Sequence, residues 1–211
     1  MLVEDKNRRR RLRLLIKNLN KERKRQAKQI DILCNDFIAA QRDFIKRLNT
    51  ITFAANFYES IIGTTDLGSL LQAAVRDIRE EIAGANVTFF LRRGEDFELH
   101  IFESEQPIAF EKQHLENYFN SELMDNICKA NKMCTLEDMF GMGLEGNLAG
   151  LSRISAVTIP LGLAGPSLGF ILIYRSSENK LNTDELNNIA TITCGLSQAI
   201  QSCQELLHSV D

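Results

Sequence analysis

The sequence predicts an α+β protein, in which a long N-terminal helix leads into a compact domain built on an antiparallel sheet. The first observation is a heptad pattern of apolar residues from Leu12 to Ile61, with neither Pro nor Gly before Gly63. The second is a pair of strong strand patterns at 154–163 and 168–175, joined by a short Gly- and Pro-containing turn. Such a turn predicts a hairpin and therefore antiparallel strands.

The heptad pattern predicts a coiled coil. Its fifteen core positions are spaced alternately by four and three residues, and twelve of them are apolar or aromatic. Water cannot cover such a stripe favourably, so a partner helix is expected. We expect a homodimer through a parallel coiled coil, and the alternative is a helix that folds back on its own domain. The predicted dimer interface consists of Ile30, Leu33, Phe37, Ala40, Phe44, Ile51, Ala54 and Tyr58.

Three polar core positions weaken this seam, namely Arg23, Gln26 and Arg47. Facing arginines repel one another across a dimer axis unless their long side chains reach water. The helix before Ile30 is the least secure part. We divide it into a basic N-terminal arm, residues 1–29, and a coiled-coil helix, residues 30–62.

The basic arm carries a charge opposite to that of the rest of the chain. Residues 1–30 hold twelve Lys or Arg and three acidic residues, a net of +9, and the remainder has a net of −12. This arm could bind nucleic acid, an anionic membrane or an acidic protein, and a solvated helix end is the alternative. No aromatic residue lies among the arginines to stack on bases. The residues concerned are Arg8, Arg9, Arg10, Arg11 and Arg13.

Composition is typical of one domain of about 150 residues plus the helical arm. The longest apolar stretch, 154–173, is interrupted by Pro160 and Pro166, so it does not resemble a membrane span. The N-terminal arginines are not followed by the apolar core of a signal peptide. We therefore expect a cytoplasmic protein.

No residue pattern predicts catalysis or a metal site. The five cysteines include no CxxC pair, and the three histidines are isolated. Neither a nucleophile elbow nor a Gly-rich phosphate loop occurs. We predict that the protein is not an enzyme and name no cofactor. A redox enzyme that uses Cys128 and Cys134 is the open alternative.

The domain is expected to contain one helix before the strands of its sheet and another after them. A capped helix is predicted from Asp66 to the stop at Gly84, with an apolar stripe from Leu67 to Ile82. A final helix is predicted from an N-cap at Asn182 or Thr183, with an apolar stripe from Leu186 to Leu207. Residues 138–152 contain four glycines and are predicted to form a mobile loop or lid. Further strands are expected at 85–92, 97–103 and 133–136, and short helices at 111–119 and 121–130.

The order of these elements resembles a GAF domain. The most specific local match is a strand that ends in Ile159-Pro160-Leu161, followed by a strand that opens with Leu168-Gly169. The resemblance covers about residues 53–207. It implies an antiparallel sheet with the first and last helices on one face, and with the short helices and loops on the other.

The resemblance also implies a pocket for a small molecule under the short helices. In the family such pockets hold cyclic nucleotides, tetrapyrroles or amino-acid metabolites, whereas some members have a closed pocket and serve as dimerisation modules. Each apolar residue placed there could instead belong to the core. By analogy the pocket would be framed by Phe102, Glu103, Tyr118, Phe119, Ile127, Met133, Thr135 and Met139.

No particular ligand is favoured by the residues. Cyclic-nucleotide-binding members carry Asn-Lys, a Phe and an Asp-Glu pair, whereas this chain has Leu181 in place of the Phe, and Asp184-Glu185 follows after only two residues. Plain helix capping would give the same acidic pair. No Cys has the adjacent His that a thioether-linked bilin needs.

The function expected from these features is that of a non-enzymatic dimeric sensor. A ligand would change helix packing, and the coiled coil would pass that change to a protein partner or to an output domain outside this chain. The alternative is a structural adaptor with a filled pocket, which acts through its coiled coil and basic arm.

Overall fold

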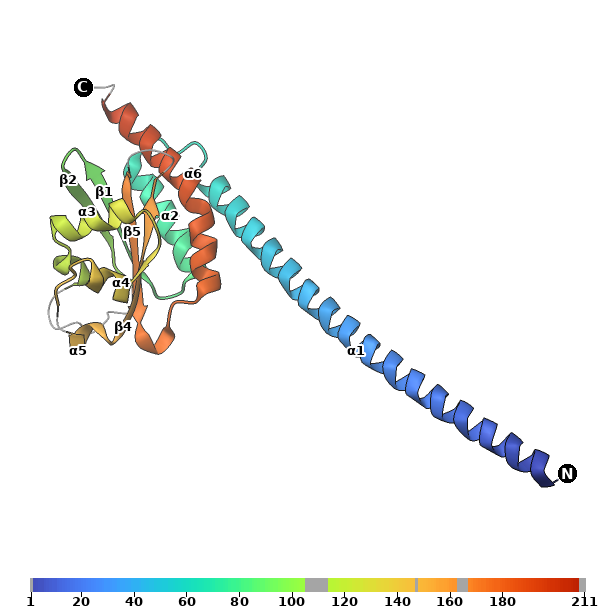
Figure 1. The fold of residues 1–211 in the computed structure, drawn as a ribbon. Helices are drawn as coiled ribbons and strands as arrows, with labels where there is room; N and C mark the ends of the chain where they lie inside the picture. Colours follow the sequence, from blue (N-terminus) through green and yellow to red (C-terminus); the bar gives the residue numbers. More distant parts are fainter. Residues whose placement is uncertain (1, 105–113, 147, 163–166, 209–211) are drawn as a thin grey trace. The chain divides into compact units, whose positions relative to one another are not determined.

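The computed structural model describes residues 2–104, 114–146, 148–162 and 167–208, and it confirms the α+β class. The chain forms two compact units, Met1–Ile51 and Thr52–Asp211. The first unit is helical, and the second contains the sheet and the remaining helices (Figure 1). Within the described residues, no helix combines the length and apolar composition needed to cross a membrane.

Helix α1 spans Leu2–Ile61, so the long helix predicted from the heptad pattern is confirmed. Its large apolar side chains over the first unit are exposed in the single chain, whereas apolar side chains normally lie inside. An apolar stripe, interrupted at Arg23 and Gln26, is therefore left uncovered. The exposed residues are Leu12, Leu14, Leu15, Ile16, Leu19, Ile30, Ile32, Leu33, Phe37, Ile38, Phe44, Ile45, Leu48 and Ile51.

The last turns of α1 belong to the second unit and pack on its core. Phe57 is 0% exposed and Ile61 is 8% exposed, while Phe53, Ala54 and Tyr58 are partly buried against the same core. A Cβ on Gly195 would overlap the ring of Tyr58, so the glycine makes room for this ring. Ala54 and Tyr58 of the predicted dimer interface thus pack within their own chain, where the predicted domain 53–207 overlaps the end of the coiled-coil helix.

The sheet has the strand order β2-β1-β5-β4-β3, and all neighbouring strands are antiparallel, as predicted. Gly169 has φ +133, and a Cβ there would overlap the carbonyl oxygen of Phe90, so the Leu-Gly opening of β5 is required by the close approach of β1. The strands are β1 Asn86–Arg93, β2 Asp96–Phe102, β3 Cys134–Thr135, β4 Ile154–Leu161 and β5 Gly169–Ser176.

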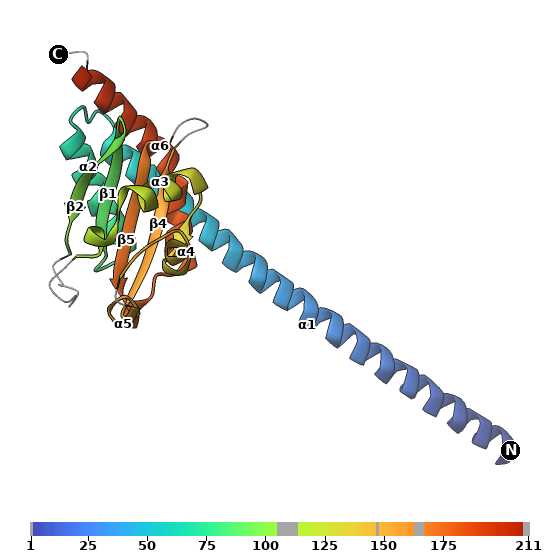
Figure 2. The same ribbon diagram turned by 60° about the vertical axis from the view of Figure 1, so that its left-hand side comes forward.

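One face of the sheet is covered by α2, Leu67–Glu81, and α6, Thr183–His208 (Figures 1 and 2). The predicted caps are confirmed, because the Asp66 carboxylate accepts a hydrogen bond from the Ser69 amide at 2.7 Å and Asn182 Oδ1 accepts one from the Asp184 amide at 3.1 Å. The apolar stripes of both helices form a core with the end of α1. We call it the α2/α6 core.

The other face is covered by shorter elements, of which α3 is predicted correctly at both ends. Among the described residues of the predicted helix 111–119, Leu115–Tyr118 form the 3-10 helix η1, and residues 111–113 lie outside the described residues. Residues 163–166 of the predicted hairpin turn also lie outside them. The remaining elements are α3 Ser121–Ala130, α4 Leu136–Gly141, α5 Leu148–Leu151 and the 3-10 helix η2 Ser177–Asn179.

The glycine-rich segment 138–152 is a correction. It was predicted to be a loop, but much of it lies in α4 and α5. The Thr135 hydroxyl accepts a hydrogen bond from the Asp138 amide at 3.3 Å, and the Asp138 carboxylate accepts one from the Thr135 amide at 2.8 Å. This capping box starts α4, and burial of Met139 and Leu144 holds the segment against the sheet.

Candidate functional site on the α3 face of the sheet

Side chains fill the space between the sheet and the short helices. We call this cluster the α3-face core. It is built mainly from β1, β4 and β5 on the sheet side and from η1, α3 and α4 on the helical side, so segments far apart in the sequence meet there. Its buried members are Phe90, Leu115, Phe119, Leu123, Met124, Ile127, Cys128, Cys134, Met139, Leu144, Leu151, Ile154, Ala156, Phe170, Leu172 and Tyr174.

A group of aromatic rings lies over the centre of the sheet. Phe90 and Phe170, on neighbouring strands, are stacked with ring centroids 4.6 Å apart and an interplanar angle of 15°. The ring of Phe119, which follows η1, lies 5.0 Å from that of Phe90 and 6.0 Å from that of Phe170. Such ring pairs add packing energy beyond their buried area. The three rings therefore fix η1 against the strands.

A carboxylate is buried beside these rings. Glu116 on η1 is 3% exposed. The Thr88 hydroxyl on β1 donates a hydrogen bond to its Oε1 at 2.6 Å, and the Tyr174 hydroxyl on β5 donates one to its Oε2 at 3.2 Å. Among the described residues, no basic side chain forms an ion pair with Glu116. A buried carboxylate that has only neutral donors is costly, so its presence calls for an explanation.

The phenol of Tyr174 is held in its neutral form. Burial raises its pKa far above the usual value for tyrosine, and the negative charge of Glu116 raises it further. Tyr174 therefore remains a hydrogen-bond donor to Glu116 at any physiological pH. The carboxylate and its two hydroxyl donors form a rigid polar group in apolar surroundings, which we call the Glu116 group.

The border of this face carries an ion pair between the sheet and α3. Arg92 on β1 pairs with Asp125 on α3, and its guanidinium also lies 5.0 Å from the centre of the Phe97 ring. Asn126 on α3 donates a hydrogen bond to the carbonyl oxygen of Met142 at 3.2 Å. These contacts hold α3 in place over the α3-face core.

Four of the eight residues predicted to frame the pocket lie together. Phe119, Ile127 and Met139 are buried members of the α3-face core, and Tyr118 packs against its border. Thr135 lies at the start of α4, where its side chain forms the capping box. The Glu103 carboxylate is exposed and pairs with His114 Nε2 at 3.3 Å.

Phe102 and Met133 are corrections, because both pack against the α2/α6 core on the opposite side of the sheet. Phe102 is paired with Val87, and its ring lies 6.1 Å from that of Phe89, edge to face. Alternate residues of a strand point to opposite faces, so this register directs Phe102 away from the α3 face. The pattern of the single strand left this choice of face open.

None of the three residues of the Glu116 group is predicted from the sequence. The acidic residue lies in a segment that reads as an ordinary polar helix end, and Thr88 and Tyr174 fit the usual composition of strands. Only the pairing of β1 with β5 brings the two hydroxyls together. In this register Thr88 lies opposite Leu172, and Tyr174 is two residues further along β5, on the same face of the sheet. No local sequence signal would have identified the group.

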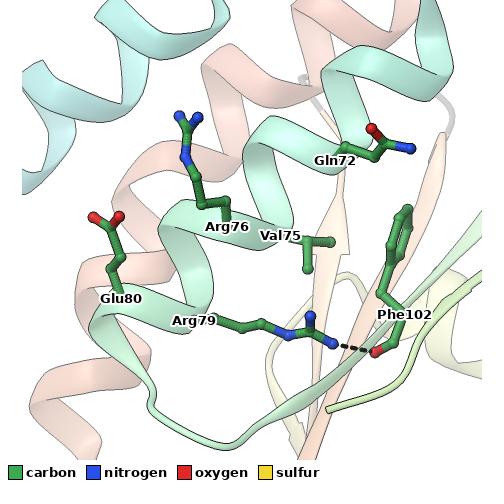
Figure 3. A pocket seen from close by; sticks show the side chains of 6 residues that line it. All are labelled: Gln72, Val75, Arg76, Arg79, Glu80 and Phe102. Carbon is green, nitrogen blue, oxygen red and sulfur yellow. Dashed lines mark hydrogen bonds between the residues drawn. The ribbon is translucent and has the colours of Figure 1, made fainter. Parts of the chain in front are cut away.

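A shallow hollow of about 450 Å³ lies on the other side of the domain, beside α2 (Figure 3). Both arginines that line it have partners within the chain. The Arg79 guanidinium donates hydrogen bonds to the carbonyl oxygens of Phe102 at 2.8 Å and Ala85 at 3.3 Å. Arg76 pairs with Asp77 at 3.0 Å. The hollow thus marks where α2 is tied to β2. Its lining residues are Gln72, Val75, Arg76, Arg79, Glu80 and Phe102.

The cysteines of the redox alternative are buried. Cys128 and Cys134 both belong to the α3-face core, and burial raises the pKa of each thiol. A raised pKa keeps a thiol protonated and unreactive. Cys34 and Cys194 are exposed. Within the part of the chain that the structure describes, no three His, Cys, Asp or Glu side chains gather into a group that could hold a metal ion.

Glu185, one member of the acidic pair weighed for cyclic-nucleotide binding, has structural partners. The Glu185 carboxylate pairs with Arg175 at 2.8 Å and accepts a hydrogen bond from the Asn182 amide, also at 2.8 Å. Arg175 in turn donates to the Lys180 carbonyl oxygen at 2.6 Å. The Arg175–Glu185 ion pair therefore anchors the start of α6 to β5.

Comparison with known proteins places the domain by its fold. No protein-family model matches the sequence, and no curated protein matches it. Among solved structures, the GAF domain of a phosphoenolpyruvate-protein phosphotransferase from Coxiella burnetii is 13% identical with a TM-score of 0.56, covering 75% of this chain and 96% of that one. The corresponding domain from Acinetobacter is 11% identical with a TM-score of 0.54, covering 75% and 97%.

A third solved structure, the GAF domain/HD domain protein from Geobacter sulfurreducens, is 14% identical with a TM-score of 0.51 and covers 66% of this chain and 95% of that one. At such low identity the likeness establishes the fold alone. The globular domain has the GAF fold, as the order of its elements predicts.

Proposed function

We propose that this GAF-fold chain is a dimeric sensory module that binds a small molecule on its α3 face and relays the change through α1. The Glu116 group carries this proposal. A carboxylate that is 3% exposed and held by two neutral hydroxyls is a poor device for stability, but it is a good anchor for a ligand that donates hydrogen bonds. The ligand class that fits is a small molecule with an amine or amide N–H.

The relay depends on the sheet, because both cores share its strands. Phe89 and Phe90 are consecutive on β1, and one packs in the α2/α6 core while the other packs in the α3-face core. The α2/α6 core also contains Phe57 and Ile61 of α1. A shift of β1 on ligand binding would therefore reach the end of α1 directly, and a packed element with two arrangements is what coupling requires.

The homodimer is supported by the exposed face of α1. Eight large apolar side chains at predicted core positions, Leu12, Ile16, Leu19, Ile30, Leu33, Phe37, Phe44 and Ile51, are each more than half exposed. If each offers on the order of 100 Å², two copies would bury on the order of 1,600 Å², which is the size of a standard specific interface. The output is then a protein partner or a further domain, in the cytoplasm.

Native mass spectrometry of protein purified from its own host tests the proposal. The expected result is a dimer that carries a defined extra mass, and this mass is lost in the Glu116→Gln variant. Glu103→Gln is the matched control, because the exposed Glu103 carboxylate lies outside the α3-face core and the extra mass should be kept. A monomer would contradict the dimer, and a dimer whose extra mass is unaffected by Glu116→Gln would contradict the anchor.

The second candidate is an adaptor with a filled pocket. It is favoured by the closely packed rings of Phe90, Phe119 and Phe170, which already occupy the centre of the α3 face. An adaptor would appear as a bare dimer, and its stability would not respond to small molecules. Addition of a ligand library followed by thermal unfolding separates the two candidates, since a ligand at 100 times its Kd raises stability by about 2.7 kcal/mol.

The basic arm is proposed to bind polyanions, with a nucleic acid, an anionic membrane and an acidic protein as the candidate partners. Its arginines Arg8–Arg11 and Arg13 are exposed on α1. Reversing Arg8 to Arg11 to Glu should abolish salt-sensitive binding to vesicles rich in anionic lipid or to duplex DNA. Binding that is equal in both proteins would rule out this role.

A further inference from the structure

We propose that two copies of α1 meet along two successive faces, and that the contact moves from one face to the other at Arg47 and Leu48. This inference rests on the proposed dimer and specifies its interface. The first seam, defined as Ile30, Leu33, Phe37, Ala40 and Phe44, follows the heptad pattern. The second seam, defined as Leu48, Ile51 and Ala55, continues it on a rotated face.

Packing within the chain makes the original heptad face inaccessible near the domain. The heptad pattern assigns Ala54, Tyr58 and Ile61 to the interface, but all three pack against the α2/α6 core. The Tyr58 ring fills the space beside Gly195 on α6, and its hydroxyl donates to the Thr191 carbonyl oxygen at 3.5 Å. Side chains that are already used by their own domain cannot also line a dimer axis.

A different apolar stripe is exposed at the same level of the helix. Ile51 is 64% exposed and Leu48 46%, and Ala55 is also exposed. The intervals of three and four residues from Leu48 to Ala55 are those of a coiled-coil seam.

Charge marks the point of change. The heptad pattern places Arg47 at a core position, where two arginines would face each other across the axis. Leu48, the next residue, is apolar and exposed. Moving the contact from Arg47 to Leu48 replaces a repulsive pair with an apolar one and turns the Arg47 side chain towards water.

In coiled-coil terms this change of face is a stutter, an interruption of the heptad pattern equivalent to inserting four residues. From Ala40 the core positions run to Phe44 and then to Leu48, so two intervals of four follow each other. Such an insertion locally unwinds the supercoil. An interval of four residues exceeds the 3.5-residue heptad average by half a residue, which rotates the contact face by about 50°.

The stutter gives the relay a defined place to act. Packing of Tyr58 and Phe57 in the α2/α6 core decides which face of α1 is left for the partner helix. A rearrangement of this core would change the choice between the two faces, which makes the segment around Arg47 a two-state element.

Disulfide cross-linking of single-cysteine variants tests the inference in the full-length chain. Cys34 and Cys194 are exposed and are first replaced by Ser. Ala54→Cys and Ala55→Cys form a matched pair of neighbouring small residues, one on the original heptad face and one on the second seam. Ala40→Cys, on the first seam, reports the dimer itself.

The expected result is rapid cross-linking of Ala40→Cys and Ala55→Cys, with Ala54→Cys at least tenfold slower. Rapid cross-linking of Ala54→Cys with slow cross-linking of Ala55→Cys would overturn the stutter and leave the dimer intact, and so would cross-linking at Ala40→Cys alone. A monomeric mass without cross-linking at Ala40→Cys would overturn the proposed dimer. Circular dichroism of each variant verifies that α1 is retained.

Discussion

The two faces of the sheet are packed in different ways. On the α2/α6 side, buried polar groups have a local or an oppositely charged partner: the Ser197 hydroxyl donates to the Thr193 carbonyl oxygen of its own helix at 2.6 Å, and Arg175 on β5 pairs with Glu185 on α6 at 2.8 Å. On the α3 side, a carboxylate lies against the strands and is bonded by hydroxyls from β1 and β5. The difference indicates that the α2/α6 side is built for stability, whereas the α3 side carries a polar group that stability does not require.

The largest expected effect compares neighbouring phenylalanines on opposite faces. Phe89 and Phe90 are both fully buried, so replacing either by Ala should lower the free energy of unfolding by about 3–5 kcal/mol. Urea unfolding measures both values. A loss below about 1 kcal/mol for Phe90→Ala alone would show that the α3 face is loosely packed, as an open pocket would be.

Removing a donor from the Glu116 group should have the next largest effect. Thr88→Val deletes the hydroxyl that donates to Glu116 at 2.6 Å and leaves a buried carboxylate oxygen without this partner. The expected loss in the free energy of unfolding is about 1–3 kcal/mol, and Thr88→Ser, which keeps the hydroxyl, should lose much less. Equal losses in the two variants would mean that the lost methyl group matters and the hydrogen bond does not.

The raised pKa of Tyr174, on the α3 side of the sheet, predicts that the free energy of unfolding depends on pH in the alkaline range. Below about pH 10 the phenol is protonated in both the folded and the unfolded chain, so it contributes no slope. Above that pH the unfolded chain releases the proton, while the folded chain retains it because burial and Glu116 raise the pKa. The free energy of unfolding should therefore fall with rising pH by about 1.4 kcal/mol per pH unit from this group.

Tyr174→Phe should remove this alkaline slope, and Tyr118→Phe, at the border of the α3-face core, should keep it. Guanidinium unfolding between pH 9 and 11 measures the difference between the two variants and the unsubstituted protein. An identical slope in all three proteins would show that Tyr174 ionises as readily in the folded chain as in the unfolded one.

Sequence periodicity was sufficient for the regular elements and insufficient for the faces they present. The stripe from Leu70 to Ile78 predicted α2 and its buried side, because one helix face is long enough to read from one segment. Phe102 was assigned to the wrong face, since the face of an edge strand depends on its register with β1. The Glu116 group depends on three segments at once, and no pattern within any one of them reports it.

The smallest expected effect concerns segment 138–152, which its glycines predict to be a loop but which the capping box at Thr135 makes partly helical. Asp66 caps α2 on one side of the sheet and Thr135 caps α4 on the other. Replacing either by Ala should lower the free energy of unfolding by about 1 kcal/mol. Because the Asp138 carboxylate also bonds the Thr135 amide, Thr135→Ala should leave half of the capping box, so amide exchange in α4 should rise without complete loss of protection. If Asp66→Ala is destabilising and Thr135→Ala changes neither stability nor exchange, the segment after Thr135 behaves as the loop that its glycines predict. The α3 face would then be covered by a mobile segment, whereas the α2/α6 side is covered by stable helices.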